Sequence, residues 1–158
     1  MKTNILFFVL TAGVMNAGCS SLSNSNIFER FSLQSIASKT SYKNIDCSKA
    51  TGGDAVDAEG SEFGRGGTGS LRPSTIRCEV IEAGNKGFSE TDFIDALLSE
   101  VEKEIKVSGG TMTGRSRPSL SNFVVDYEVR GRQGKINVSG KRNDSSYDLT
   151  SEIREWTK

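Results

Sequence analysis

Apolar and polar residues alternate along the last third of the chain. In residues 122–130 every second side chain is apolar, and the alternation continues through residues 135–139 and 147–156. A period of two places apolar side chains on one face of a strand and polar side chains on the other. The three segments therefore predict an antiparallel meander with one buried face and one wet face.

Residues 88–110 have the period of a helix instead. Apolar side chains recur every three or four positions from Phe93 to Ile105, and Ser89 is placed to cap the start. Two glycines, Gly109 and Gly110, end the segment. We expect the apolar stripe to pack on the buried face of the meander.

A single alternating segment, residues 75–81, precedes the helix and predicts one more strand. The expected fold class is α+β: a two-layer sandwich of one long helix on a mostly antiparallel sheet of about four strands, in the order β-α-β-β-β. Residues 75–158 are the expected small α+β domain.

The middle of the chain is rich in glycine. Residues 51–74 hold seven glycines and few large apolar side chains, so ordering this backbone costs entropy for little burial. Residues 47–74 are therefore predicted to be a mobile loop. Three acidic residues in it, Asp54, Asp57 and Glu59, lack the spacing of a calcium loop.

The start of the chain has the layout of a secretory signal. Residues 5–15 are almost wholly apolar, follow one lysine, and are too short to span a bilayer as a helix. Residues 20–26 are serine- and asparagine-rich and predict a tether. We assign residues 19–46 to this tether, with a short helix expected within residues 27–36.

Asn16, Ala17, Gly18 and Cys19 resemble the lipobox of bacterial lipoproteins. The resemblance implies that residues 1–18 are a cleaved lipoprotein signal peptide and that Cys19 receives the lipid, palmitate included. It also implies that Ser20 is the sorting residue. Because Ser20 is not aspartate, the expected address in a Gram-negative cell is the outer membrane, facing the periplasm, rather than the inner membrane.

Acylation of Cys19 leaves an even number of cysteines in the mature chain. Cys47 and Cys78 are then expected to form a disulfide bond, because disulfides persist in oxidising compartments. Two separate buried thiols are the alternative.

The charges of the chain balance, with 20 basic and 20 acidic residues and no histidine. No global field favours nucleic acid, and the absence of histidine lowers the expectation of a metal site or a histidine-dependent active site. The sequence predicts no cofactor and no metal. Basic residues are nevertheless concentrated in residues 111–142, where they either form a patch for an anionic partner or simply balance the acidic helix. The seven are Arg115, Arg117, Arg130, Arg132, Lys135, Lys141 and Arg142.

These features predict a non-catalytic lipoprotein, held at the membrane by its lipid, that binds an envelope protein or cell-wall component or has a structural role. One version is an inhibitor or immunity-type protein that acts through the loop of residues 51–74. The alternative is a hydrolase of cell-wall or polysaccharide substrates, with Asp148 and Glu152 as its two carboxylates. A carrier for a small apolar ligand would need a cavity that the dense helix stripe argues against.

Overall fold

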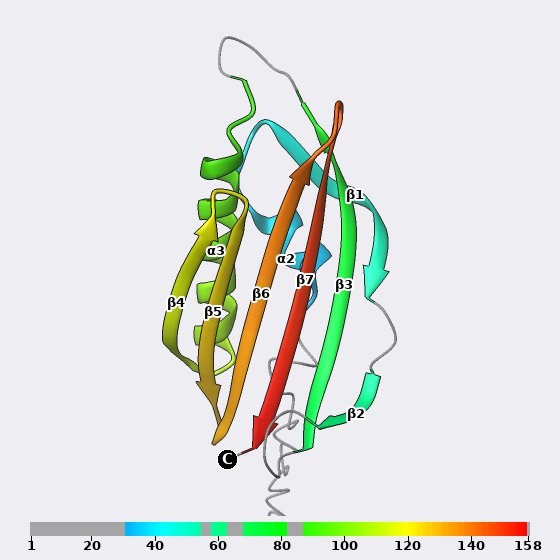
Figure 1. Ribbon diagram of the computed structural model, residues 1–158. Coiled ribbons are helices and arrows are strands. Elements are labelled where there is room, and N and C mark those ends of the chain that lie inside the picture. Colours follow the sequence, from blue (N-terminus) through cyan, green and yellow to red (C-terminus); the bar gives the residue numbers. More distant parts are fainter. Residues whose placement is uncertain (1–30, 55–57, 63–67, 82–86, 158) are drawn as a thin grey trace, which may run out of the picture.

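The computed structural model describes residues 31–54, 58–62, 68–81 and 87–157, and in this part of the chain two helices lie on one face of an antiparallel sheet (Figure 1). The helices are α2 (Leu33–Lys39) and α3 (Glu90–Val107). The strands are β1 (Ile45–Asp54), β2 (Ala58–Glu62), β3 (Thr68–Val80), β4 (Thr111–Ser119), β5 (Asn122–Val129), β6 (Arg132–Arg142) and β7 (Ser146–Thr157).

The strands lie in the order β1-β3-β7-β6-β5-β4, and β2 pairs with the first part of β3. Each pair is antiparallel. The predicted meander is present as β5, β6 and β7, with Val125, Ile136 and Ile153 in register across it. All three side chains are buried toward the helices. The α+β class and the antiparallel sheet are thus confirmed.

Helix α3 forms where the apolar period predicts it. The hydroxyl of Ser89 accepts a hydrogen bond from the backbone N–H of Asp92 at 3.3 Å, which satisfies one of the free donors of the first turn. The stripe that faces the sheet is buried: Phe93, Ile94, Leu97, Val101 and Ile105.

The predicted count of about four strands is too low. Strand β4 was not predicted because it is an exposed edge strand with no apolar alternation. Its two arginines pair with α3 instead: Arg115 lies 3.4 Å from Glu102, and Arg117 pairs with Asp95. These charges and Pro118 on the same strand are common features of a protected sheet edge.

The predicted loop over residues 47–74 is largely strand in its described parts. Strand β1 runs to Asp54, β2 follows, and β3 begins at Thr68. Strand β3 is paired with β7 from Gly69, opposite Trp156, to Glu79, opposite Ser146. Pairing of β3 with β7, β1 and β2 supplies backbone hydrogen bonds to the described parts of the glycine-rich stretch, so order there does not depend on apolar side chains alone.

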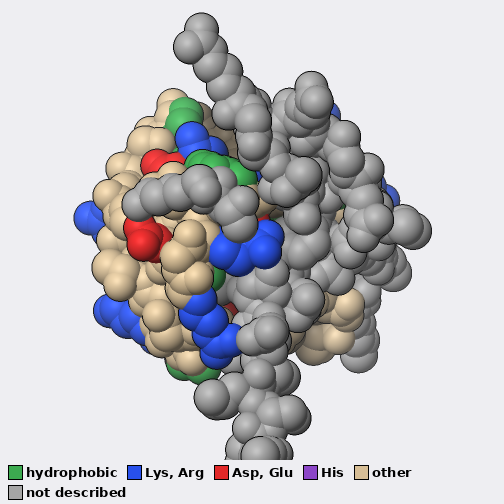
Figure 2. All heavy atoms as spheres, turned by 90° about the horizontal axis from the view of Figure 1, so that it is seen from below, with side chains coloured by type: hydrophobic (Ala, Val, Ile, Leu, Met, Phe, Trp, Pro, Cys, Tyr) green, Lys and Arg blue, Asp and Glu red, His purple; other side chains and the backbone are tan. Residues whose placement is uncertain are grey.

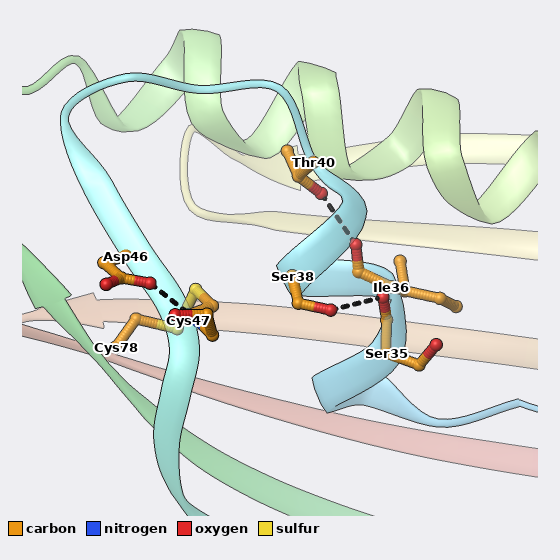
Figure 3. Close-up of a disulfide and its surroundings, with 8 residues drawn as sticks. Ser35, Ile36, Ser38, Thr40, Asp46, Cys47 and Cys78 are labelled. Carbon is orange, nitrogen blue, oxygen red and sulfur yellow. Dashed lines mark hydrogen bonds between the residues drawn. A yellow bond between two sulfur atoms is a disulfide. The ribbon is translucent and has the colours of Figure 1, made fainter.

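The domain also begins earlier than predicted. Residues 19–46 were assigned to a tether, yet Phe31, Leu33, Ile36 and Ile45 are buried in the core. The expected short helix is α2, displaced toward the C-terminus from residues 27–36. At its end the hydroxyl of Thr40 donates to the carbonyl of Ile36 at 3.0 Å (Figure 3).

The predicted disulfide is present. Cys47 of β1 and Cys78 of β3 are bonded, with their Cα atoms 4.5 Å apart, and both are buried beside α2 (Figure 3). The bond joins neighbouring strands directly, which fixes β1, the outer strand, to β3, the next strand of the sheet. The pair belongs to the core and is not a surface thiol site.

Candidate binding site

One face of the sheet is left uncovered by the two described helices. Along β7, alternate side chains from Tyr147 to Glu155 are buried beneath the helices, and those between them point to the opposite face. We call this opposite side the open face. It is the wet face that the alternation predicted.

Two rows of side chains cross the open face from β5 to β7. In the first row, Val124 is opposite Asn137, which is opposite Glu152. The second row, two residues further along each strand, holds Asp126, Lys135 and Arg154. The register of three strands therefore brings together residues from positions 124 to 154 of the chain.

A hollow of about 170 Å³ lies between these rows. It is open to solvent on one side and is lined by Val124, Lys135, Asn137, Glu152 and Arg154. All five side chains come from strands, which hold functional groups more rigidly than loops do. We take this hollow as the candidate site.

The two cations of the hollow are directly opposite each other on neighbouring strands. Such a like-charge pair is destabilising unless other charges compensate it. Compensation is present here, because Lys135 Nζ lies 3.4 Å from Asp126 Oδ1 and the Arg154 guanidinium lies 3.1 Å from Glu152 Oε2. Both pairs are substantially exposed, so both cationic groups can also contact a ligand.

Asn137 lies in the first row, on β6, between Val124 of β5 and Glu152 of β7. Its oxygen Oδ1 is fully buried and accepts no hydrogen bond from any described group. A buried acceptor without a donor costs free energy. The hollow thus combines two exposed ion pairs with a buried carboxamide oxygen that no described donor reaches.

The open face also carries Trp156, the single tryptophan of the chain, two positions beyond Arg154. Its indole N–H donates to Gln133 Oε1 at 3.3 Å. The side chain is partly buried. Its place next to the second row makes it a natural reporter of binding in the hollow.

The two carboxylates of the hydrolase hypothesis lie on the open face but do not meet. Asp148 and Glu152 are four residues apart on one strand, a separation of roughly 13 Å between Cα atoms. Asp148 binds Arg77 through two hydrogen bonds of 2.6 and 3.1 Å, and it accepts another from Asn143 at 2.7 Å. The hydrogen bond from Arg77 lowers the pKa of Asp148, which keeps it ionised. Of the two carboxylates, Glu152 lines the hollow, whereas Asp148 is engaged by Arg77 and Asn143 outside it.

The seven basic residues of the predicted patch are distributed over three parts of the molecule. Arg115 and Arg117 face α3, and Arg130 and Arg132 lie at the turn between β5 and β6. Seen from below, basic side chains stand apart from one another among acidic and neutral groups on the described surface (Figure 2). Only part of the predicted set can therefore act together.

The remaining three basic residues lie on β6. Lys135 lines the hollow, whereas Lys141 lies on the same face six positions further on, opposite Asp148. The guanidinium of Arg142 stacks over the ring of Phe88, 4.9 Å from its centroid. The hollow thus contains one member of the predicted set and adds Arg154, which the sequence did not single out.

A second charged group lies on the buried side of the sheet. The carboxylate of Glu155 is fully buried, accepts a hydrogen bond from Tyr127 at 2.7 Å, and lies 3.2 Å from the guanidinium of Arg132. Burial, together with the charge of Glu155, raises the pKa of Tyr127. Because Tyr127 and Arg132 satisfy this carboxylate, we regard it as structural.

Cys19 and Ser20 lie outside the described residues, so the lipid anchor stays a prediction. Among the described residues no helix is long and apolar enough to cross a membrane. In the same part of the chain, no group of three or more cysteine and acidic side chains is placed to hold a metal ion. A scan against protein-family models and searches of curated proteins and of solved structures each found no significant match.

Proposed function

We propose that the chain is a lipid-anchored protein of the bacterial cell envelope whose α+β domain binds another envelope component through the open face of its sheet. The observation that supports the binding role is the solvent-open hollow on this face, lined by Val124 and Asn137 and by the exposed charged groups of Lys135, Glu152 and Arg154. The role is non-catalytic and depends on recognition rather than on proton transfer.

The envelope address is supported by two separate features. The leader with Cys19 resembles that of lipoproteins, and acylation with more than one chain gives stable anchoring. The bond between Cys47 and Cys78 is of the kind that persists outside the reducing cytoplasm. The inhibitor version of the hypothesis relied on a loop over residues 51–74, and it loses that support because β1, β2 and β3 occupy most of the segment.

The anchor is tested by mass spectrometry of the mature N-terminus and by fractionation of cells. We expect an acylated Cys19 in the outer-membrane fraction, loss of membrane association in Cys19→Ala, and unchanged behaviour in the control Ser21→Ala. We expect Ser20→Asp to move the protein to the inner membrane. An unmodified Cys19 in the wild-type protein would overturn the anchor.

The binding role is tested with a photo-crosslinking amino acid at one of two exposed positions. Thr150 lies on the open face, and Lys103 lies on α3, which covers the other face of the sheet. We expect specific crosslinks to an envelope component from position 150 and none from position 103. Equal capture from both positions, or none from position 150, contradicts the assignment of the open face.

A further inference from the structure

The hollow on the open face is polar, but its charges are balanced. Lys135 pairs with Asp126 and Arg154 pairs with Glu152, so each cation has an anion beside it. We propose that the hollow binds a neutral oligosaccharide, with one sugar ring in the hollow and the next ring packed on Trp156. This inference rests on the proposed function and names the chemistry of the partner, an uncharged glycan of the cell envelope.

The preference for an uncharged ligand follows from this balance. Arg154 also takes part in a further interaction besides its pair with Glu152. The two cations therefore leave no excess charge for an anion to neutralise, and an anion in the hollow is repelled by Glu152, which lines it. A cationic ligand is repelled by Lys135 and Arg154 in the same way. A neutral ligand meets neither repulsion.

The preference for hydroxyl groups follows from the donors and acceptors that the ion pairs leave available. Lys135 Nζ has three N–H donors, and within the described part of the chain its partner is Asp126. In the same part of the chain, Glu152 is engaged through Oε2, so its Oε1 remains an acceptor. Both side chains are 47% exposed. A hydroxyl donates and accepts, so neighbouring hydroxyls of one sugar can bind both groups, and hydrogen bonds to charged groups are the stronger class.

The second contact is the ring of Trp156. This residue lies on the open face two positions beyond Arg154, roughly 7 Å further along β7. Its indole N–H already donates to Gln133, so the flat ring is the part that contacts a ligand. Gly69, opposite on β3, places no side chain beside the ring. One face of a sugar ring presents C–H groups, and these pack on an aromatic ring.

The size of the hollow limits what enters it. A volume of 170 Å³ is less than the roughly 300–1,000 Å³ of a typical small-molecule pocket, and the hollow is open to solvent on one side. It therefore holds a single ring and leaves the outer side of that ring in water. Binding through one ring and the contact with Trp156 is expected to be weak, with a Kd on the order of 1 mM for a short oligosaccharide.

A peptide is the competing neutral ligand. Peptides are recognised through pockets for their side chains or by addition of a strand at a sheet edge. Among the described residues that line the hollow, Val124 alone is apolar, so the hollow provides no side-chain pocket. The lining belongs to β5, β6 and β7, which are inner strands of the sheet, so no edge is available there. These features favour the oligosaccharide.

The test is a titration of the full chain, purified in a detergent without a sugar head group, followed by the fluorescence of Trp156 and by NMR of backbone amides. The neutral probes are the trimers of N-acetylglucosamine and of α- and β-linked glucose. The charged probes are the trimers of glucosamine and of galacturonic acid, and trialanine amide with an acetylated N-terminus is the peptide probe. We expect at least one neutral trimer to give saturable shifts at the hollow that added salt leaves unchanged. The charged trimers and the peptide are expected to bind severalfold more weakly. Failure of every neutral trimer to shift the hollow, or a charged trimer or the peptide that binds as tightly, would overturn the inference.

Variants locate the two contacts. Lys135→Gln combined with Asp126→Asn removes one ion pair without changing the net charge, and we expect it to weaken binding of the neutral trimer severalfold. Trp156→Leu, followed by NMR, is expected to do the same. Lys141→Gln, on the same face of β6 outside the hollow, is the matched control and should bind as the wild type does. Each variant is compared with the wild type in thermal midpoint. Unchanged binding in the ion-pair variant and in Trp156→Leu would contradict the site.

The outcome is distinguishable from that of the proposed function. If position 150 captures a partner in cells and the ion-pair variant and Trp156→Leu leave that capture unchanged, the open face binds but the oligosaccharide inference is wrong. If a neutral trimer binds in the hollow while position 150 captures no partner, the envelope-binding role is wrong instead.

Discussion

The ring of Tyr127 lies directly over Gly134 on the neighbouring strand. The two residues are opposite each other in β5 and β6, and a Cβ at position 134 would overlap with Cζ of the ring. The ring of Tyr147 on β7 likewise lies over Gly140, although Tyr147 is opposite Arg142 in register. Two glycines of β6 thus leave the space that the rings of two buried tyrosines fill. Packing of an aromatic ring over a glycine on a neighbouring strand is a known feature of β-sheets.

Substitution of either glycine is expected to destabilise the domain. Gly134→Ala and Gly140→Ala force buried rings to move, and overpacking of this kind costs about 1–3 kcal/mol of the free energy of unfolding. The measurement is urea unfolding. Gly87→Ala is the control, because a Cβ there meets nothing within 4 Å. A Gly134→Ala protein as stable as Gly87→Ala would contradict the packing.

Removal of the Arg132 cation is expected to destabilise the fold, because the buried carboxylate of Glu155 then lacks its charged partner. Arg132→Gln should lower the free energy of unfolding by roughly 1–3 kcal/mol, because the side chain is one third exposed and water replaces part of the interaction. Arg130→Gln, two positions away at the exposed turn, is the matched control. Adding Glu155→Gln to Arg132→Gln should restore part of the loss, and purely additive effects would contradict the coupling.

Loss of the Cys47–Cys78 bond is expected to weaken the whole fold. The bond closes a loop with a sequence separation of 31, for which chain entropy gives about 3.5 to 4 kcal/mol. The double variant Cys47→Ala with Cys78→Ala should therefore unfold at much lower urea concentration, with no further effect of a reducing agent. The wild-type protein should shift in the same direction on reduction, and unchanged stability after verified reduction would contradict this contribution.

The buried tyrosines are expected to make the fold sensitive to high pH. Burial, with the nearby carboxylates Glu155 and Glu90, raises the pKa of Tyr127 and Tyr147. Their neutral forms therefore stabilise the fold fully below the unfolded pKa near 10, and stability is lost above it at about 1.4 kcal/mol per pH unit for each group. Tyrosinate absorbance from these residues should appear together with unfolding. Their ionisation in a protein that keeps its near-ultraviolet circular dichroism would contradict their burial.

The sequence alone predicts those helices and strands whose apolar side chains recur with a helical or a strand period. The stripe from Phe93 to Ile105 and the alternation through β5 and β7 identify α3, the meander and the open face, because burial on one side imposes these periods. The sequence does not predict β4, because this strand is exposed along its length and lacks apolar alternation. Nor does it predict the glycine-rich part of β1 and β3, because the order of that part depends on pairing with strands distant in the chain.

The candidate site was predictable only in part for the same reason. Alternation places Lys135, Asn137, Glu152 and Arg154 on one face, but the register that puts Asn137 opposite Glu152 is a property of the assembled sheet. Lys135 entered the basic set through local charge, and Glu152 entered as a carboxylate. Asn137 has no signal of its own in a single sequence, because its importance follows from the lack of a donor around it.

The position of β3 between β1 and β7 sets the order in which the chain can fold. Arg77 meets Asp148 across 71 positions, and within the described part of the chain β1 pairs with β3 alone. The sheet therefore cannot close before the last strand has been synthesised, and such non-local pairing is slow. A nascent chain of this kind completes its sheet only once its last strand is free to pair between β3 and β6.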